Sequence, residues 1–311
     1  MRTCWRRIKR ICRASLANMD FYIGIDGGGT GSRLVAIDAG KNMLASVEGG
    51  STNIAAVGRE VVSSNIKALV EQLGYGLADC NGLCIGSAGA TVGDNRRILE
   101  EIFRELGYSG KVLISNDGEL MLLAETGGEP GAILISGTGS VAYAIDLAGT
   151  RHRAGGWGHI IDDGGSGYRI GMDAIQAVQK AFDGRGAATM LTQMIDVDMS
   201  YIYSPTFHKA EIAKLAVVVC TAAEQGDSVA LAIERRAAIE LVELATAVIT
   251  RAGLVEHEHK LVLSGSVILR NANIRSIFED EMRRRFNNIR ITEPSKSPAF
   301  GAALLARGDF P

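Results

Sequence analysis

A strand–glycine turn–strand pattern occurs twice in this sequence and constrains the fold more than any other feature. The first copy, FYIGID-GGGTGS-RLVAID, starts at Phe21, and the second, GAILISGTGSVAYAID, lies within residues 130–146. Each copy contains a Thr-Gly-Ser triplet followed, at the same spacing, by an Ile-Asp pair. A repeated supersecondary unit implies repeated domains. The sequence therefore predicts two similar domains that face a cleft.

Composition limits the class of protein. The 311 residues are enough for two domains with separate cores, and the 38 glycines stand against only 5 prolines. These glycines are clustered, which is typical of tight loops that approach a ligand rather than of a fibre. A net charge of −2 gives no reason to expect nucleic acid or a membrane surface as a partner. No apolar run approaches the ~20 residues of a membrane span.

The first 18 residues differ from the rest of the chain. They hold six basic side chains and no acidic one, without the apolar run of a secretory signal. A transit peptide or a basic surface helix fits this composition, and so does a disordered extension produced by a start codon upstream of Met19. We expect the disordered extension, followed by an N-terminal domain over 19–126 and a C-terminal domain with a helical insertion over 127–311.

The five cysteines form no tight pairing pattern, and an odd number suggests a reducing compartment. We therefore expect a cytoplasmic protein with no cysteine-based metal cluster. A homodimer is a separate expectation that does not depend on the cysteines.

Short apolar runs alternate with segments of helical periodicity along the chain. GLCIGSAG and KVLISND are typical of buried strands, and NRRILEEIFRELG is typical of an amphipathic helix. Beyond Asp146 the chain becomes mainly helical, with helices predicted near 173–182, 211–225 and 227–252. The segment ITEPSKSPAFGAALLA predicts a short strand and a terminal helix. Strands alternating with helices indicate an α/β fold.

The first glycine turn, Asp26-Gly27-Gly28-Gly29-Thr30, has the composition of a phosphate-binding loop. Glycines allow backbone N–H groups to approach an anion closely. Asp26 at the strand end could hold Mg²⁺ through water, and Thr30 could donate to a phosphate oxygen. A plain tight hairpin is the alternative, although a hairpin rarely needs three glycines.

The second glycine turn, Ser136-Gly137-Thr138-Gly139-Ser140, contains a Gly-x-Gly-x-x-Ala string. That string resembles a dinucleotide-binding fingerprint, but the fingerprint must open a helix, and here an alternating strand follows. The chain also lacks a Gly-x-x-x-x-Gly-Lys-Ser/Thr loop. Two phosphate hairpins in a duplicated α/β chain therefore call for a different nucleotide fold.

Asn116 and Asp117 follow a predicted strand, where an α/β sheet presents its functional side chains. Phosphoryl transfer to an alcohol needs a carboxylate that accepts the hydroxyl proton, and Asp117 is placed for that role. The alternative is that Asp117 only caps the following helix, and the two roles are compatible.

These motifs together resemble the N-acetylglucosamine kinase and benzoyl-CoA-reductase-activator ATPase family, within the superfamily of actin, hexokinase and heat-shock chaperones. The matching stretches are YIGIDGGGTGSR, GGSTN, ISND, ISGTGS, GGWGHIIDDGGSGYRIG, LSGSV and SPAFGAALLA. The resemblance implies two actin-like (ribonuclease H-like) domains, ATP and Mg²⁺ as cofactors, and phosphorylation of a small sugar.

The resemblance also implies roles for individual residues. Asp117 matches the catalytic base. The positions implied for ATP and its phosphates are Asp26, Gly28, Gly29, Thr30, Gly137, Thr138, Gly139, Gly265, Ser266 and, more weakly, Ala213. The positions implied for the sugar are Ser51, Asn53, Asn116, Gly156, Trp157 and Asp163. From the residues alone, Asn53 could instead support a turn, and Asp163 could also cap its loop.

Three residues depart from the family pattern. Val141 stands where a sugar-binding Asn can occur, Gly164 replaces a common acidic residue, and Val217 replaces a common Pro. N-acetylglucosamine, converted to its 6-phosphate, is the substrate that GGWGH and STN favour, with glucosamine or N-acetylmuramic acid as alternatives.

Two other classes of function remain open. One is an ATPase that activates a reductase or dehydratase, but such relatives hold an iron–sulfur cluster with cysteines, and IGSAGATVGDNRR contains none. The other is a sugar sensor without turnover, which the intact Asp117 disfavours.

Overall fold

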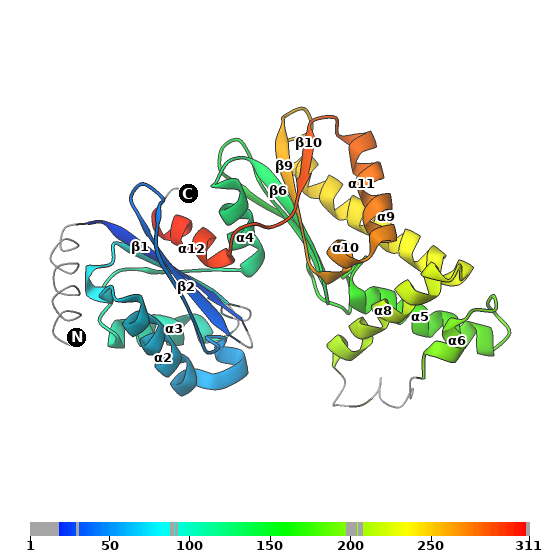
Figure 1. The fold of residues 1–311 in the computed structure, drawn as a ribbon, viewed down its shortest axis with the longest axis horizontal. Helices are drawn as coiled ribbons and strands as arrows, with labels where there is room; N and C mark the ends of the chain where they lie inside the picture. Colours follow the sequence, from blue (N-terminus) through cyan, green and yellow to red (C-terminus); the bar gives the residue numbers. More distant parts are fainter. Residues whose placement is uncertain are drawn as a thin grey trace, which may run out of the picture. The chain divides into compact units, whose positions relative to one another are not determined.

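The computed structural model describes residues 19–308, apart from 29–30, 88–89, 91–92, 197–203 and 205–207 (Figure 1). The chain divides into two compact units. Unit 1 comprises the described residues up to Gly127 and from Lys296 onward, and unit 2 runs from Gly128 to Ser295. Among the described residues, no helix is both long and apolar enough to span a membrane.

Unit 1 is built on a five-stranded sheet in the order β3-β2-β1-β4-β5. Strands β1, β2 and β3 are antiparallel neighbours, whereas β4 and β5 continue in parallel beside β1. Its elements are β1 (Phe21–Gly27), β2 (Ser32–Asp38), β3 (Met43–Gly49), α2 (Ile54–Leu73), η1 (Leu77–Asp79), β4 (Gly82–Ser87), α3 (Asn95–Glu105), β5 (Val112–Ser115), α4 (Asp117–Thr126) and α12 (Pro298–Ala306).

Unit 2 repeats this topology in a second five-stranded sheet, in the order β10-β9-β6-β7-β8. Strands β6, β7 and β8 are antiparallel, and β9 and β10 continue in parallel beside β6. Its elements are β6 (Gly131–Ser136), β7 (Ser140–Ile145), β8 (Arg151–Gly155), α5 (Gly167–Phe182), α6 (Leu191–Met194), α8 (Lys209–Glu224), α9 (Ser228–Arg251), β9 (His259–Ser264), α10 (Ser266–Arg270), α11 (Ala272–Arg285) and β10 (Ile289–Thr292).

The two sheets therefore match strand for strand, with β1, β2 and β3 corresponding to β6, β7 and β8. This correspondence confirms the predicted α/β fold with a duplicated domain. The strand β7 after the second glycine turn also confirms that the turn does not open a helix.

Alternation along β2 separates the two faces of the unit 1 sheet. Leu34 and Ala36 belong to the core that α2 and α3 cover, while Val35 and Ile37 pack with α12 on the other face. Figure 1 shows α12 and α4 together on that face. Successive side chains of β2 point to opposite faces of the sheet, and both faces are covered. The residues from Leu34 to Ile37 are therefore all buried.

The terminal helix α12 belongs to unit 1, whereas the sequence assigned all of 127–311 to the second domain. Its fit depends on glycines at close approaches. A Cβ at Gly301 would lie 1.8 Å from the carbonyl oxygen of Leu120 in α4, and one at Gly24 would lie 2.1 Å from that of Ala299. Nothing in the local pattern of α12 reveals these partners, because they are distant in sequence.

The core of unit 2 lies on the face of its sheet covered by α9. Ala142 and Ala144 of β7 and Leu261 and Leu263 of β9 pack with α9 and with Phe278 of α11. Helices α5 and α8 pack on each other beside α9. The small alanines of β7 leave room for the long helix to lie close to the sheet.

Two local predictions for unit 2 need correction. Helix α5 begins at Gly167, six residues before the predicted start near 173, because Ser166 caps it by accepting the N–H of Arg169 at 3.2 Å. Glycine is disfavoured inside helices, so the glycines of this first turn gave no helical signal in the sequence. Strand β8 was not predicted, since three of its five residues are Arg or His and none of the five is fully buried.

Candidate active site

The first glycine turn connects β1 and β2, whose last pair is Gly27 with Ser32. The turn is compact, since a Cβ at Gly28 would lie 2.9 Å from the carbonyl oxygen of Gly31. Gly29 and Thr30, both predicted to bind phosphate, lie outside the described residues. The described part of the turn therefore lies between β1 and β2, where the sequence predicts the glycine turn, and its binding of phosphate stays a prediction.

A hydroxyl network ties this hairpin to the segment before α2. Ser51 donates its hydroxyl to the carbonyl oxygen of Gly28 at 2.8 Å, and Thr52 shares a 2.8 Å hydrogen bond with Ser32. The N–H of Thr52 also donates to the Ser32 hydroxyl. The Ser51 proton is therefore committed to the hairpin, so Ser51 supports the phosphate turn and could only accept a bond from a sugar.

Asn53 and Asn116 are both helix caps. Asn53 Oδ1 accepts the N–H of Ala55 at the start of α2, and Asn116 Oδ1 accepts the N–H of Glu119 at the start of α4. Capping occupies only the amide oxygen of each residue. The amide nitrogen remains the group that each could offer to a sugar hydroxyl.

Asp26 and Asp117 lie at the same edge of the unit 1 sheet, because β1, β4 and β5 are parallel and both residues stand at strand ends. Burial and, as a smaller effect, the charge of Asp117 raise the pKa of Asp26 to about 6, while Arg33 opposes the rise. Burial also raises the pKa of Asp117. Its Oδ1 atom is buried and has no hydrogen-bond partner among the described residues. Such an atom is a candidate for an external donor.

The second glycine turn connects β6 and β7 and is hydrogen-bonded to the first residues of helix α5. The N–H groups of Gly167 and Tyr168 donate to the carbonyl oxygens of Gly137 and Thr138 at 2.8 and 3.3 Å. The first amides of α5, which have no partner within the helix, are satisfied in this way. The hairpin therefore turns its carbonyl groups toward α5.

Asp163 lies directly against this hairpin. Its side chain is only 3% exposed, and its Oδ1 accepts the N–H of Ser140 at 3.2 Å. Its φ of +69° is rare for a residue with a side chain and marks a backbone held by its surroundings. Lys209 Nζ lies 3.9 Å from Oδ2. Asp163, assigned to the sugar by resemblance, is thus shown to contact the phosphate-type hairpin.

Gly156 and Trp157 begin the loop that leads to Asp163. The Trp157 ring is 69% exposed, the Arg153 guanidinium stacks over it at 4.8 Å, and the Trp157 N–H donates to Asp162. A Cβ at Gly156 would lie 2.9 Å from Val141 Cγ2. Val141 is therefore a direct neighbour of Gly156.

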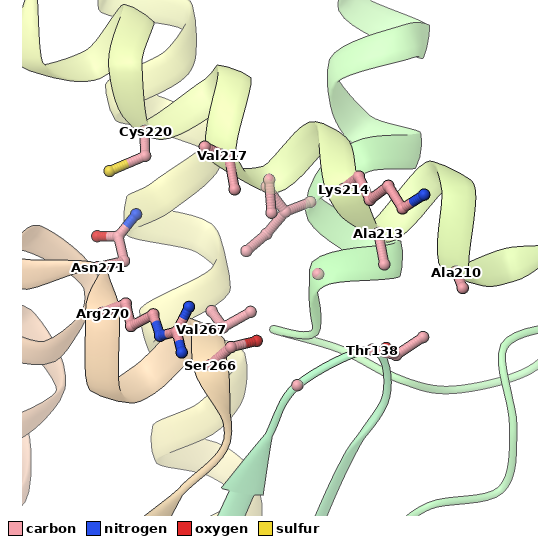
Figure 2. Close-up of a pocket in the computed structure, with 14 residues that line it drawn as sticks. Thr138, Ala210, Ala213, Lys214, Val217, Cys220, Ser266, Val267, Arg270 and Asn271 are labelled. Atoms are coloured by element: carbon pink, nitrogen blue, oxygen red, sulfur yellow. The ribbon is translucent and has the colours of Figure 1, made fainter. Parts of the chain in front are cut away.

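A pocket of about 560 Å³ opens beside the second hairpin (Figure 2). Four of the residues predicted for the nucleotide or its phosphates line it, namely Gly137, Thr138, Ala213 and Ser266. Gly265 adjoins it with a φ of +97°, and a Cβ there would lie 2.3 Å from the carbonyl oxygen of Ser136. The structure thus brings together, around one pocket, residues that are far apart in sequence.

Ten further residues line the pocket that were not predicted to do so, and five of them lie on α8. They are Gly167, Ile170, Ala210, Lys214, Ala216, Val217, Cys220, Val267, Arg270 and Asn271. Figure 2 shows the labelled α8 side chains following one another along the helix, opposite Ser266, Val267, Arg270 and Asn271. The spacing of 210, 213, 214, 217 and 220 is that of one helix face, a signal that could have extended the single prediction of Ala213.

Two of these residues define the chemistry of the pocket wall. Val217 is 71% exposed, an unusual position for an apolar side chain and one that suits contact with a flat ring. Burial and, as smaller effects, the charges of Glu234 and Glu224 raise the pKa of the Cys220 thiol to about 11. The thiol is therefore neutral at physiological pH and is a packing group. Among the described residues, no group of three His, Cys, Asp or Glu side chains could hold a metal ion.

Comparison with known proteins places this geometry in a family. The N-acetylmuramic acid/N-acetylglucosamine kinase of Clostridium acetobutylicum is 36% identical over 308 residues, covering 94% of this chain and 99% of that protein. The N-acetyl-D-glucosamine kinase of Dictyostelium discoideum is 30% identical over 311 residues, covering 92% and 98%.

A solved structure supports the same assignment. The structure of a protein described as an N-acetylglucosamine kinase from Chromobacterium violaceum is 28% identical, with a TM-score of 0.68, covering 93% of this chain and 99% of that one. The model of the BadF/BadG/BcrA/BcrD ATPase family matches residues 23–306. The resemblance drawn from the motifs is confirmed, and the chain belongs to the BadF/BadG/BcrA/BcrD ATPase family.

Proposed function

We propose that this protein is an ATP-dependent kinase that phosphorylates a hydroxyl of an amino sugar, with N-acetylglucosamine as substrate and its 6-phosphate as product. The family, and the kinase activities for which its relatives are named, support a carbohydrate kinase. The observation that carries the proposal is Asp117, whose buried Oδ1 has no hydrogen-bond partner in the described part of the chain.

Asp117 is the general base of the proposed reaction. As the sugar hydroxyl attacks the γ-phosphorus, the proton of the hydroxyl passes to the Asp117 carboxylate and the bond to the leaving ADP oxygen breaks. Burial raises the pKa of Asp117, which makes its carboxylate a stronger base than an exposed one. The unpaired Oδ1 is a site at which a hydroxyl could donate without displacing an existing bond.

The nucleotide binds at the pocket of unit 2. The volume of this pocket, about 560 Å³, suits a ligand of the size of a nucleoside. Gly137 and Thr138 line the pocket. The carbonyl oxygens of Gly137 and Thr138 are turned toward α5, and the N–H groups of Gly137 and Ser140 bond to Gly139 and Asp163. Thr138 and Gly139 are therefore the residues of the turn whose N–H groups could bind phosphate oxygens. The hairpin after Asp26 supplies the second set of glycine amides.

Mg²⁺ is part of the proposal, and Asp26 is the residue that would hold it through water. A half-buried carboxylate whose pKa is raised by burial and by a second carboxylate is a poor place for an uncompensated negative charge. A divalent cation would relieve both effects. When bound, Mg²⁺ supplies neutralisation of the charge on the phosphate oxygens.

The sugar contacts of the proposal come from Asn53, Asn116, Gly156, Trp157 and Asp163. The amide nitrogens of the two asparagines are left by the caps that their oxygens form. The exposed Trp157 ring offers an apolar face of the kind on which sugar rings pack. Glucosamine and N-acetylmuramic acid remain alternative substrates, because curated relatives carry those activities too.

A coupled assay for ADP release over glucosamine, N-acetylglucosamine, N-acetylmuramic acid and glucose tests the proposal. We expect turnover with an acetylated amino sugar. Asp117→Asn should lower kcat by 10²–10⁴-fold with ATP binding nearly intact, since that is the usual contribution of a positioned base.

Glu119→Gln is the matched control. Glu119 lies in the same helical turn as Asp117, and its carboxylate accepts a hydrogen bond from Ser115. Because the proposal gives this carboxylate no part in the reaction, Glu119→Gln should keep kcat within a few-fold of the wild type. Retention of more than about a tenth of wild-type turnover by Asp117→Asn would remove Asp117 from the role of base.

A further inference from the structure

The second phosphate hairpin rests on a loop, Asp163 to Ser166, that holds it through several bonds. Ser140 donates its N–H to Asp163 Oδ1 and its hydroxyl to the carbonyl oxygen of Gly164, the latter at 2.6 Å. Ser136 donates its hydroxyl to the carbonyl oxygen of Gly165 at 2.8 Å. Both ends of the turn therefore depend on the position of this loop, which we call the support loop.

The support loop is anchored on its other side by one side chain of α9. Glu240 Oε2 accepts the N–H of Gly165 at 2.7 Å, a short bond to a carboxylate. A Cβ at Gly164 would lie 3.2–3.3 Å from three Glu240 atoms, Oε2, Cβ and Cδ. Glu240 thus fills the space beside Gly164.

We propose that Glu240 is a positioning residue for ATP binding: from α9 it supplies the carboxylate that fixes the support loop, and through it the Gly137–Ser140 hairpin. The inference rests on the proposed function only in naming ATP as the ligand of that hairpin. Glu240 touches no substrate, and it acts through the N–H of Gly165 and the bonds from Ser136 and Ser140.

Burial and the neighbouring groups act on the Glu240 carboxyl in opposite directions, and the net effect is a raised pKa. Burial raises the pKa of its carboxyl, while the Gly165 N–H opposes the rise. Charged neighbours on α5 and α9 also act on it, Asp173 raising its pKa and Arg169 and Arg236 lowering it. The support loop therefore stabilises the charged form of Glu240, and the charged form is the better acceptor for Gly165.

Glu240 also forms part of a separate surface groove of about 620 Å³, together with Asp162, Arg169 and Glu243. Glu243 lies one turn further along α9, is exposed, and lines the same groove. It is the matched control, because Glu243→Ala removes a carboxylate from the groove without touching the support loop.

Two measurements on Glu240→Ala, Glu240→Gln and Glu243→Ala test the proposal. The first is hydrogen exchange of the Gly165 amide in the protein without nucleotide, where Glu240→Ala should exchange at least tenfold faster and Glu243→Ala should match the wild type. Glu240→Gln keeps an acceptor oxygen and should stay within threefold. This arm holds whether or not the protein is a sugar kinase.

The second measurement separates KM from kcat. Glu240→Ala should raise the KM for ATP about tenfold while the KM for the sugar stays within twofold, and Glu240→Gln should recover most of the loss. A wild type that phosphorylates no amino sugar would overturn the proposed function and leave the exchange result to decide the role of Glu240.

Gly164→Ala perturbs the same bond from the loop side, because its Cβ would press on Glu240 at 3.2 Å. Its effect on Gly165 exchange should nearly vanish in the Glu240→Ala background, since both changes act through one bond. Exchange and ATP KM values of Glu240→Ala equal to those of Glu243→Ala, or additive effects in this double variant, would overturn the proposal.

Discussion

The charge of Asp117 adds to the rise that burial causes in the pKa of Asp26, which reaches about 6. The two carboxylates come from different strand ends, β1 and β5, at one edge of the unit 1 sheet. Two like charges in a half-buried site are mutually unfavourable unless a proton or a cation joins them. This relation makes the stability of the protein without ligands depend on pH.

The folded-state pKa of Asp26, about 6, lies above the ordinary Asp value of 3.8, so between these values the native state binds more protons than the unfolded state. Stability from this group is therefore complete at low pH and is lost as pH rises toward 6 and above. Relative to Asp26→Asn, the wild type should lose thermal stability between about pH 4 and 7, and Mg-ATP should restore part of it. Melting curves of the two proteins that stay parallel across this range would contradict the assignment.

Val141 should determine how strongly the protein distinguishes acetylated from free amino sugars. It neighbours Gly156 and can contact a methyl group but cannot bond an amide. We expect kcat/KM values for N-acetylglucosamine and glucosamine to differ by less than about a hundredfold. Val141→Asn adds a hydrogen bond worth ~1 kcal/mol and should shift the ratio about fivefold toward the acetylated sugar. An unchanged ratio would place Val141 away from the acyl group.

Gly265→Ala should weaken ATP binding specifically. The new Cβ would lie 2.3 Å from the carbonyl oxygen of Ser136 and 2.9 Å from the nitrogen of Gly137, so the second hairpin must shift. We expect the KM for ATP to rise tenfold or more. Gly226→Ala is the control, because its φ of +85° carries the same backbone strain with no atom within 4 Å of the new Cβ. Equal KM values for ATP in the two variants would argue against this prediction.

Gly301→Ala should destabilise unit 1 through the contact between α12 and α4. Its Cβ would lie 1.8 Å from the carbonyl oxygen of Leu120, and overpacking of this kind typically costs ~1–3 kcal/mol. The midpoint of chemical denaturation reports the loss. Gly308→Ala, which follows α12, carries backbone strain from its φ of +84° but has open space at its Cβ, so it should shift the midpoint less. A midpoint for Gly301→Ala at or above that of Gly308→Ala would show that α12 does not pack in this way.

Much of the fold follows from local sequence because periodicity and glycine placement are local signals. The hairpins at Gly28 and Gly137, the strand that follows each, and the N-cap of α9 at Asp227 can all be read from neighbouring residues. The duplication could be read as well, because the same unit occurs twice. The start of α5 was missed where glycines hide a helix that Ser166 caps.

The candidate site divides along the same line. The sequence by itself determined which residue types stand at strand ends and turns, which was sufficient to name Asp26, Asp117 and the two glycine turns. Only the tertiary structure decided which partners bond across the chain. Ser51 donates its hydroxyl to Gly28, Asp163 accepts the N–H of Ser140, and Glu240 accepts the N–H of Gly165. These bonds join residues 23 to 75 positions apart, and a periodic pattern within one element holds no information about such partners.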